Sequence, residues 1–479
     1  MNLDQKIIEA TPPFVRDWSV RPKRRMAPAS PVQRVWLVAL AALAMTVLEG
    51  AFRKWVPGFG GGAAKYLMYF SKDLIFAALL FYPQRSQPSP ALQVFGNWLV
   101  PGCSLLLAGA AISCAHGLNP VGAVLTARAV VVLPFIAWLV VPRLAGLPLR
   151  QVVGLLTILT IFNFALGVEQ NRLPADHLLN RYADADMQVI EAASGVRATG
   201  TFAYIAGLAL ISSAGIWAGL VGMGMANSQR QRLVAWVALA AGMGCALASI
   251  SRSPVVIGLA MILGWLVSAQ DGLSIFLRGL FVGVLGLAVA AALGVTGIFS
   301  NLGSGLLERQ ATAGDTFSDR AFGPLSEMVR ALQLSPLGNG FGSEQVGGQF
   351  YTTGQAGFNH FESALPRLVM EAGALGLLGY LVVCAGAILA LQRAKRGVQS
   401  SGAKSALTAT QLFLLPMFYG AVIFNHTASA FAWLIFAVVL AAAELNPQAK
   451  PAGVKTELEP SVSSGQKTWP PRPNRDHQI

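Results

Sequence analysis

Three arginines and one histidine lie in or beside the polar connections of this otherwise apolar chain, and together they could act on a phosphorylated substrate. They are Arg197, Arg252, Arg320 and His360. A guanidinium group presents a planar set of N–H donors that matches the oxygens of a diphosphate. An imidazole can accept a proton from an attacking hydroxyl group near neutral pH. The four residues therefore predict a site that binds a diphosphate and assists attack by a hydroxyl group.

Each of these residues also has a purely structural interpretation. A single arginine at a membrane surface commonly forms a weak salt bridge or extends its aliphatic stem along lipid. His360 lies in the segment 358–362, between a glycine-rich loop and an apolar stretch, where a hydrogen bond from its ring could close the loop. Convergence of three arginines beside this histidine is what favours the functional interpretation.

Two further residues, Glu371 and His426, are supporting candidates for the same site. His426 lies at a predicted outer hairpin, and Glu371 lies shortly after the start of the apolar stretch that follows His360. Asp184 and Asp186 are separated by one residue, which is the spacing of a metal-binding pair. Two such carboxylates can hold a divalent ion. A three-residue match in an acidic loop is equally typical of a solvated surface. We therefore predict no metal ion and no other cofactor.

Charged residues also occur inside the first two apolar segments. Glu49 and Arg53 are four residues apart, which places them on one face of a helix and predicts that they pair. Lys72 and Asp73 are consecutive, so their side chains point in different directions and need not pair with each other. We expect a structural role at the membrane face for this region, and Lys72 and Asp73 remain supporting candidates for the site.

The composition is that of a membrane protein. Of 479 residues, 54% are hydrophobic and 12% are charged, whereas soluble proteins carry about 25% charged residues. Stretches of 16 to 24 residues with almost no charge are long enough to cross a bilayer, and in lipid they must be helical. The net charge of +13 fits the bias of basic residues toward the cytoplasmic side. No soluble basic domain is present, so we expect no nucleic-acid partner, and we expect the four cysteines to be buried.

The hydropathy pattern predicts an all-α polytopic protein with about twelve transmembrane helices. They are expected at 35–50, 64–82, 97–115, 122–142, 149–168, 200–223, 232–250, 254–269, 274–296, 365–391, 408–425 and 427–444. The basic residues of the even-numbered connections place both termini, 1–34 and 445–479, in the cytoplasm, and the second of these tails is expected to be disordered.

Two long connections face the opposite side in this topology. The first covers 169–199, between the fifth and sixth predicted helices of the 35–296 unit, and the second covers 297–364, before the last three helices at 365–444. In the second connection, apolar residues recur at helical spacing: Phe322, Leu325, Met328, Val329 and Leu332. This pattern predicts a short amphipathic helix that lies against the membrane surface.

The arrangement of these motifs resembles the O-antigen ligase and polymerase superfamily of bacterial envelope glycan assembly. The matching segments are 197–202 (RATGTF), 251–253 (SRS), Arg320 followed by 335–342 (SPLGNGFG), and His360 followed by 370–376 (MEAGALG). They occur in the usual order of the family and cover roughly residues 190–395.

The resemblance implies an integral-membrane glycosyltransferase of the GT-C-like kind in the bacterial inner membrane. Its substrates would be a glycan donor linked to undecaprenyl diphosphate and a glycan acceptor, and a chain-length regulator and a flippase of the same pathway would be possible partners. By this resemblance Arg197, Arg252 and Arg320 would bind the diphosphate, and His360 would orient or deprotonate the acceptor hydroxyl. Transfer would invert the anomeric centre and require no metal.

Three functions remain open at this point. A polymerase would join lipid-linked repeat units, and we favour it because no loop suggests a dedicated site for lipid A or protein. A ligase would transfer the glycan to lipid A core or to a protein. A lipid-linked oligosaccharide flippase or other transporter would show broken helices near the midplane and repeat symmetry between its halves.

Overall fold

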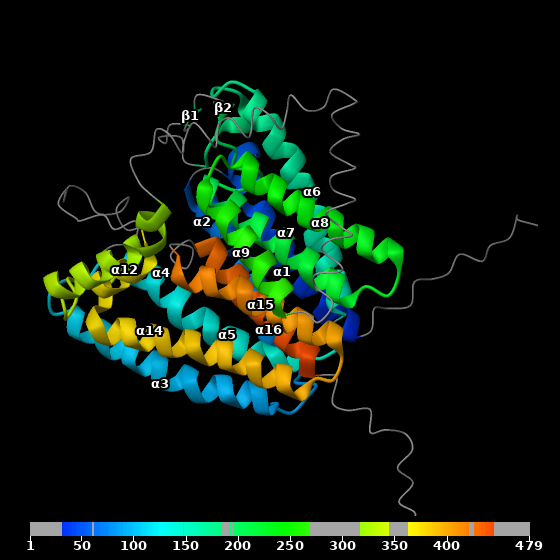
Figure 1. Cartoon of the computed structure of the whole chain (residues 1–479). Helices are drawn as coiled ribbons and strands as arrows, with labels where there is room; N and C mark the ends of the chain where they lie inside the picture. The colour runs from blue at the N-terminus through cyan, green and yellow to red at the C-terminus, as the bar shows by residue number, and fades with distance from the viewer. Residues whose placement is uncertain are drawn as a thin grey trace, which may run out of the picture.

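The structure is a computed structural model, and it describes residues 31–59, 62–146, 148–183, 189, 191–192, 195–268, 317–343, 363–420 and 426–444. Within these residues the chain is almost entirely α-helical (Figure 1). The first half contains α1 (Pro31–Trp55), α2 (Gly62–Ala78), η1 (Leu79–Phe81), α3 (Pro90–Ser113), α4 (Pro120–Ala127), η2 (Arg128–Val132), α5 (Leu133–Val140), η3 (Val141–Arg143), α6 (Leu149–Arg172) and η4 (Leu178–Asn180). The second half contains β1 (Glu191–Ala192), β2 (Gly195–Val196), α7 (Ile205–Met225), α8 (Gln229–Ala248), α9 (Arg252–Ser268), α12 (Phe317–Leu334), α14 (Ala364–Gly397), α15 (Ser401–Tyr419) and α16 (His426–Glu444).

Among the described residues, seven helical segments are long and apolar enough to cross a membrane, which supports the prediction of an α-helical multi-pass membrane protein. They are Gln33–Trp55, Pro90–Ser113, Pro120–Arg143, Leu149–Arg172, Ile205–Met225, Gln229–Ala248 and Ala364–Gly397. Helix α9 and most of α16 are apolar but shorter. Each predicted segment except the ninth overlaps a described helix, and the ninth, at 274–296, lies outside the described residues.

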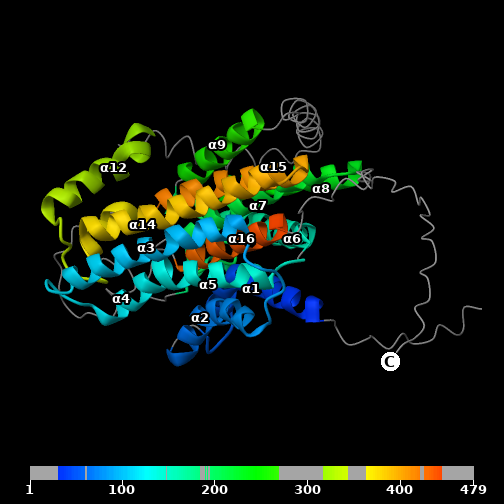
Figure 2. The same ribbon diagram turned by 90° about the horizontal axis from the view of Figure 1, so that it is seen from below.

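Helices α3 and α14 lie side by side along much of their length (Figures 1 and 2). Glycines line the contact on both helices. A Cβ atom added to Gly379 would lie 2.5 Å from the backbone nitrogen of Leu106, and one added to Gly109 would lie 2.6 Å from that of Gly376. Because no side chain separates the backbones there, the two helices approach closely, as small residues commonly allow in membrane proteins.

The aromatic core is centred on α16, which lies among the other helices when the molecule is seen from below (Figure 2). Trp433 is fully buried and its ring lies 5.9 Å from that of Phe95 on α3 and 5.4 Å from that of Phe418 on α15. On the other side of the core, Trp217 of α7 donates a hydrogen bond to Thr410 of α15 at 2.9 Å. The core therefore joins α3, α15 and α16 by ring contacts and α7 to α15 by a polar contact.

The segment Pro120–Arg143, which corresponds to the fourth helix predicted from the sequence and is called the fourth membrane segment below, contains a π-helical turn. Between α4 and α5 the backbone N–H of Leu133 donates to the carbonyl of Arg128, five residues earlier, instead of to the residue four earlier. Such a turn accommodates one extra residue within a helix and occurs often at functional sites. It holds Arg128, which is buried.

Helix α14 is broken near its start. Gly373 has φ +66° and ψ −168°, outside the helical region. The backbone N–H of the next residue, Ala374, donates to the carbonyl of Pro336 at 2.8 Å, and that of Asn339 donates to Met370 at 2.6 Å. The glycine-rich turn at 335–342 thus packs into the break and satisfies its backbone.

Helix α12 forms where the amphipathic pattern predicts it. Phe322, Leu325 and Val329 are exposed, whereas Met328 and Leu332 are half-buried against the core. The apolar face of the helix is therefore divided between contact with the bundle and exposure.

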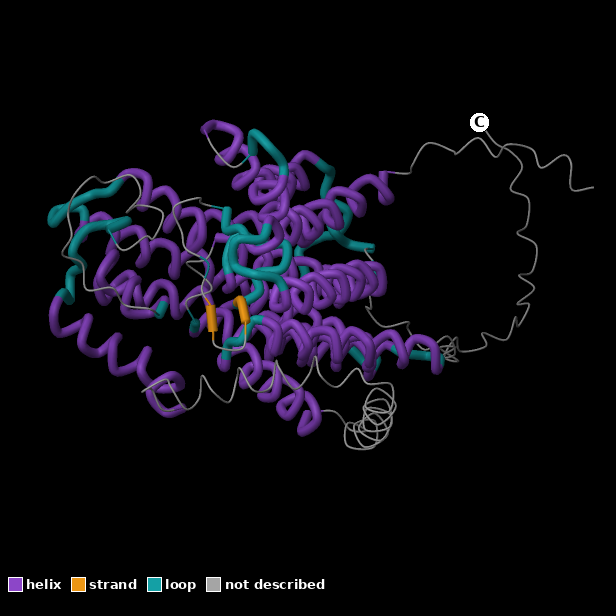
Figure 3. The backbone as a smooth tube through the Cα atoms, turned by 90° about the horizontal axis from the view of Figure 1, so that it is seen from above, coloured by secondary structure: helices purple, strands orange, loops and turns teal. Residues whose placement is uncertain are grey.

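Two local features differ from the sequence expectations. Cys114 is exposed, because it lies just past the end of α3, so the prediction that all four cysteines are buried is wrong for this residue. A small antiparallel hairpin pairs Glu191 with Val196 in the first long connection (Figure 3). Both strands have only two residues, too short for a periodic signal in the sequence.

Candidate functional site

The backbone that follows Arg197 is held by a buried amide from α6. The side-chain oxygen of Gln170 accepts hydrogen bonds from the backbone N–H groups of Thr199 and Gly200, at 3.0 and 2.7 Å. Gln170 is fully buried, and Gly200 has φ +59°, a conformation that favours glycine. The predicted motif 197–202 therefore has a fixed backbone.

Lys54, on the last turn of α1, contacts the same backbone segment after Arg197. Its ammonium group donates to Thr199 Oγ1 at 2.8 Å and to the carbonyl of Gly200 at 2.7 Å. Its nitrogen also lies 4.6 Å from the ring centre of Trp55. Lys54 is only 8% exposed, and its described oxygen partners are neutral. A buried cation beside the motif thus links α1 to the residues that follow Arg197.

Arg197 reaches the turn that carries Arg252. Its Nε–H donates to the carbonyl of Ser249 at 3.4 Å, and α9 begins at Arg252 three residues later. Both arginines are partly exposed. Between them Ile250 has φ +46°, which is rare for a β-branched residue and indicates a strained turn. The structure therefore brings two of the predicted diphosphate-binding arginines to one end of the helix bundle.

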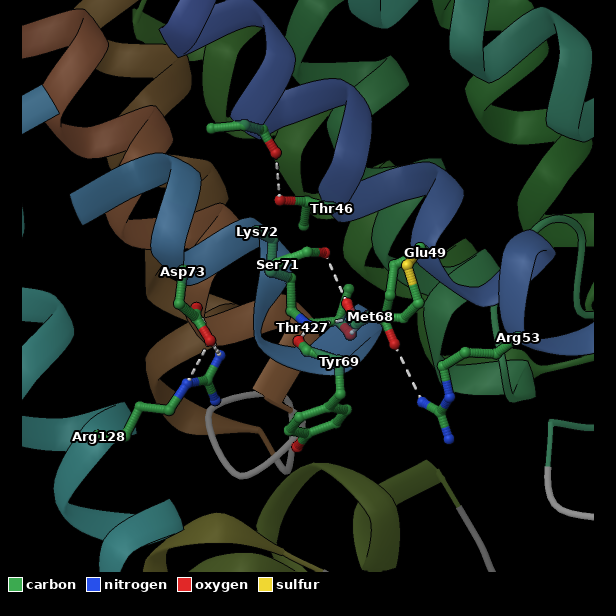
Figure 4. A network of polar contacts seen from close by, with 11 residues as sticks. Thr46, Glu49, Arg53, Met68, Tyr69, Ser71, Lys72, Asp73, Arg128 and Thr427 are labelled. Atoms are coloured by element: carbon green, nitrogen blue, oxygen red, sulfur yellow. Dashed lines mark hydrogen bonds and ion pairs between the residues drawn. The ribbon is translucent and has the colours of Figure 1, made fainter. Parts of the chain in front are cut away.

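A buried group of charged side chains connects α1, α2 and the fourth membrane segment (Figure 4). We refer to it as the charged cluster, and it consists of Glu49, Arg53, Tyr69, Lys72, Asp73 and Arg128. Its centre is the Glu49 carboxylate, which accepts from Arg53 at 3.0 Å and from Lys72 at 2.8 Å. Thr427, beside His426 at the start of α16, lies 3.5 Å from the same carboxylate. Burial of these charges is tolerated because they are paired.

The second ion pair of the cluster joins Asp73 to Arg128. Nε and Nη2 of Arg128 donate to the two carboxylate oxygens at 2.7 and 2.6 Å, a bidentate arrangement. The ring of Tyr69 lies between Arg128 and Arg53 (Figure 4), with their guanidinium carbons 5.8 and 5.7 Å from its centre. Lys72 lies 4.5 Å from the same ring centre and also donates to the carbonyl of Tyr69. Three cations therefore surround one aromatic ring.

Glu371 contacts the fourth membrane segment from α14. Its carboxylate accepts a hydrogen bond from Thr126 Oγ1 at 2.6 Å, and both residues are fully buried. Thr126 precedes Arg128 by two residues, and Glu371 precedes the break at Gly373 by two. The broken part of α14 is thus connected to the segment that carries the charged cluster.

Helix α12 is attached to the start of α14. Ser363 Oγ donates to Glu327 Oε2 at 2.9 Å. Ser363 follows His360 by three residues, and Glu327 lies two turns after Arg320 on α12. The middle of α12 is therefore hydrogen-bonded to the residue that precedes α14.

The predicted site residues fall into two groups. Arg197, Arg252, Glu371, Lys72 and Asp73 lie among the described side chains. The others, His360, Asp184 and Asp186 and the side chains of Arg320 and His426, lie outside the described residues. Of the first group, Arg197 contacts Ser249, three residues before Arg252, and Lys72 and Asp73 both belong to the charged cluster. Glu49 and Arg53 pair as predicted, and Lys72 and Asp73 have different partners, also as predicted.

Sequence reasoning missed Tyr69 and Arg128, and it gave Lys54 only a structural role at the membrane face, without a partner. An arginine within an apolar segment is itself a signal, because such residues are costly and usually functional. Lys54 and Tyr69 carry no comparable signal, because a lysine near a helix end and a tyrosine at an interface are common. In the described part of the chain, no three His, Cys, Asp or Glu residues are arranged to hold a metal ion.

Comparison with known proteins gives no family. No protein-family model matches the chain, and no curated protein matches it.

Proposed function

We propose that this protein is a polysaccharide polymerase that joins glycan repeat units carried on a lipid diphosphate at the outer face of the bacterial inner membrane. The observation that carries the proposal is the contact of Arg197 with the turn that carries Arg252. Two partly exposed guanidinium groups at one end of an apolar bundle suit the phosphate groups of a lipid-linked substrate. The full protein in this proposal has twelve membrane spans, cytoplasmic termini and a GT-C-like architecture.

The proposed glycosyl transfer requires fixed positive charge beside the leaving group. The bond between the anomeric carbon of the donor and its diphosphate oxygen breaks, and a new bond forms from that carbon to a hydroxyl oxygen of the acceptor. The lipid diphosphate leaves with the electron pair, so negative charge develops on its oxygens. Arg197 and Arg252 would stabilise this charge, and preorganised donors at such a position contribute strongly to catalysis.

The hydroxyl proton must leave the acceptor oxygen during the attack. In the proposed mechanism His360 receives it, and Arg320 adds a third positive charge near the diphosphate. The hydrogen bond between Ser363 and Glu327 supports this arrangement, because it holds the helix of Arg320 next to the residues that follow His360.

The experiment is a chain-length assay with purified protein in lipid nanodiscs and a synthetic lipid-diphosphate repeat unit. We expect His360→Ala to abolish polymer formation and Arg197→Gln and Arg252→Gln to reduce its rate by about 100-fold or more, as for the loss of one transition-state donor. His116→Ala is the matched control, because His116 is exposed and belongs to no part of the site. Unchanged polymer length and rate in His360→Ala would remove this histidine from the mechanism.

The break at Gly373 is one observation that favours a second candidate, a lipid-linked oligosaccharide flippase, because transporters use discontinuous helices. It lies ten residues into a helix of 34, within the first third of the helix and not at its midpoint. Deletion of the gene followed by gel separation of the surface glycans distinguishes the functions. Single-repeat products support the polymerase, long chains left on the carrier lipid indicate a ligase that acts on another acceptor, and loss of all export indicates a flippase.

A further inference from the structure

Asn171, on the last turn of α6, is hydrogen-bonded to both segments that lead to the two proposed diphosphate-binding arginines. Its side-chain nitrogen Nδ2 donates to the carbonyl of Val196, the residue before Arg197. The same nitrogen donates to the carbonyl of Ala248 at 3.1 Å, at the end of α8. An amide nitrogen carries two N–H donors, so this one group can serve both carbonyls. Asn171 therefore joins the two segments directly.

The end of α8 presents backbone carbonyls that need donors from outside the helix. Three of them accept hydrogen bonds from the residues that follow in the chain: Cys245 and Ala246 from Ser249, and Leu247 from Ile250. The next two carbonyls accept from other elements, that of Ala248 from Asn171 and that of Ser249 from Arg197. The partial negative charge of a helix C-terminus also favours a guanidinium group there. Asn171 and Arg197 thus complete the end of α8 together.

The preceding residue of α6, Gln170, holds the chain on the other side of Arg197. Its side-chain oxygen accepts from the backbone N–H groups of Thr199 and Gly200 at 3.0 and 2.7 Å. Consecutive residues of a helix point about 100° apart, so one turn of α6 reaches the chain both before and after Arg197. Of the residues 196–202, all of which the structure describes, only Arg197 is not buried. The backbone is therefore fixed on both sides of the partly exposed arginine.

A purely structural cap would make the same two hydrogen bonds, but the other half of the Asn171 amide argues against a role in stability alone. Its oxygen Oδ1 is buried and has no hydrogen-bond partner among the described residues. A buried polar atom without a partner is costly, and replacing such a group by an apolar one of the same shape can be nearly neutral. The particular effect of this amide is therefore the relative position of the two carbonyls that it holds.

We infer that Asn171 is a positioning residue that fixes Arg197 and Arg252 relative to each other for the diphosphate of the donor lipid. This inference rests on the proposed function. Helix α9 begins at Arg252, four residues after Ala248 and just past the strained turn at Ile250, so the place of Ala248 determines where α9 starts. Groups that act on a transition state must be held within about 0.5 Å of the productive geometry. Without the two bonds of Asn171 the segments separate more easily, although each helix stays intact.

The kinetic test replaces Asn171 by leucine, which has a similar size and no N–H donor. In the nanodisc assay we expect Asn171→Leu to lower kcat about 10- to 100-fold, because a small displacement of positioned groups costs that much. The KM of the acceptor should change less than about twofold. It is measured with a repeat unit joined to its lipid by a carbon-linked diphosphonate, which can accept a glycan but cannot donate one.

Gln411→Leu is the matched control. Gln411 is also a half-buried amide that donates to a carbonyl of a neighbouring helix, that of Ile388 on α14 at 3.2 Å. We expect its kcat and both KM values to equal those of the wild type. If Asn171→Leu does not fold, Asn171→Ser replaces it, because a hydroxyl group has one donor and can hold at most one of the two carbonyls. The same fall in kcat is expected for it.

Hydrogen–deuterium exchange in the same nanodiscs reports on the two segments without catalysis. We expect Asn171→Leu to exchange about tenfold faster than the wild type in peptides that cover 196–203 and 247–253, as for the loss of one or two hydrogen bonds. Gln411→Leu should leave both peptides unchanged. Unchanged exchange in Asn171→Leu would overturn the inference. Faster exchange with an unchanged kcat would also overturn it and leave Asn171 a helix cap.

If the wild-type protein transfers nothing, the proposed function fails, and binding of the unreactive diphosphonate lipid by native mass spectrometry still tests the position of the arginines. Binding that is about tenfold weaker in Asn171→Leu than in Gln411→Leu supports the positioning role. Equal binding by the two variants, or no binding by the wild type, overturns it.

Discussion

Replacing Glu49 by glutamine removes the negative charge at the centre of the charged cluster. The Glu49 carboxylate contacts Arg53 at 3.0 Å and Lys72 at 2.8 Å, and the three side chains are 0–5% exposed. The glutamine side chain has nearly the same volume, so the substitution leaves no cavity. Removing one partner of a buried pair costs about 3–5 kcal/mol, because it leaves buried charge uncompensated. We expect Glu49→Gln to lower the free energy of unfolding by about this amount, because the buried ammonium group of Lys72 loses its ion pair.

The measurement is reversible unfolding in mixed micelles, titrated with a denaturing detergent. Glu169→Gln is the control, because Glu169 and Arg172 form a pair at 3.9 Å whose side chains are 51% and 53% exposed. Such an exposed pair contributes about 0–1 kcal/mol. A double-mutant cycle with Lys72→Met then isolates the coupling between Lys72 and Glu49.

One result of these unfolding measurements would refute the stabilising role of the Glu49 carboxylate. If Glu49→Gln lowers the free energy of unfolding by no more than Glu169→Gln does, the Glu49 carboxylate does not stabilise buried charge. The cluster would then be hydrated, and solvent rather than Glu49 would compensate Arg53 and Lys72.

Two glycine substitutions test the packing of α14. Gly373→Ala should destabilise the protein by about 1–3 kcal/mol, because φ is +66° and the new Cβ would lie 2.7 Å from the carbonyl oxygen of Pro336. Gly379→Ala should cost about 1–3 kcal/mol by forcing α3 away from α14, since the added Cβ would meet the carbonyl of Gly102. Gly154→Ala in α6 is the control for both, because nothing lies within 4 Å of its added Cβ, and it should be neutral or stabilising by up to about 1 kcal/mol. Equal unfolding midpoints for all three variants would contradict the close approach of α3 and α14 and the strain at Gly373.

The sequence was sufficient for features that depend on local spacing or on overall hydropathy. The apolar stretches identify the helices because a bilayer demands continuous apolar segments of fixed length. The spacing of Glu49 and Arg53 identifies their pair because i and i+4 share a helix face. The same geometry explains why Lys72 and Asp73 have separate partners.

Contacts between helices that are far apart in the sequence could not be predicted from local spacing or hydropathy. Arg128 and Asp73 are 55 residues apart, and Lys54 and Thr199 are 145 apart. Their meeting depends on how each helix is rotated about its axis. Helices that are apolar on every side, such as α7, carry no amphipathic pattern from which that rotation could be read. The fit of side chains and glycines between helices decides it instead.

The extra residue in the π-helical turn at η2 rotates one half of the fourth membrane segment about the helix axis relative to the other half. Deleting one residue from 129–132 would restore regular α-helix and turn the half that carries Arg128 by about 100° relative to the other half. Arg128 would then swing away from Asp73, although the hydropathy of the segment would hardly change. The exact number of residues in this helix therefore determines whether the ion pair between Arg128 and Asp73 forms, as much as the presence of the arginine does.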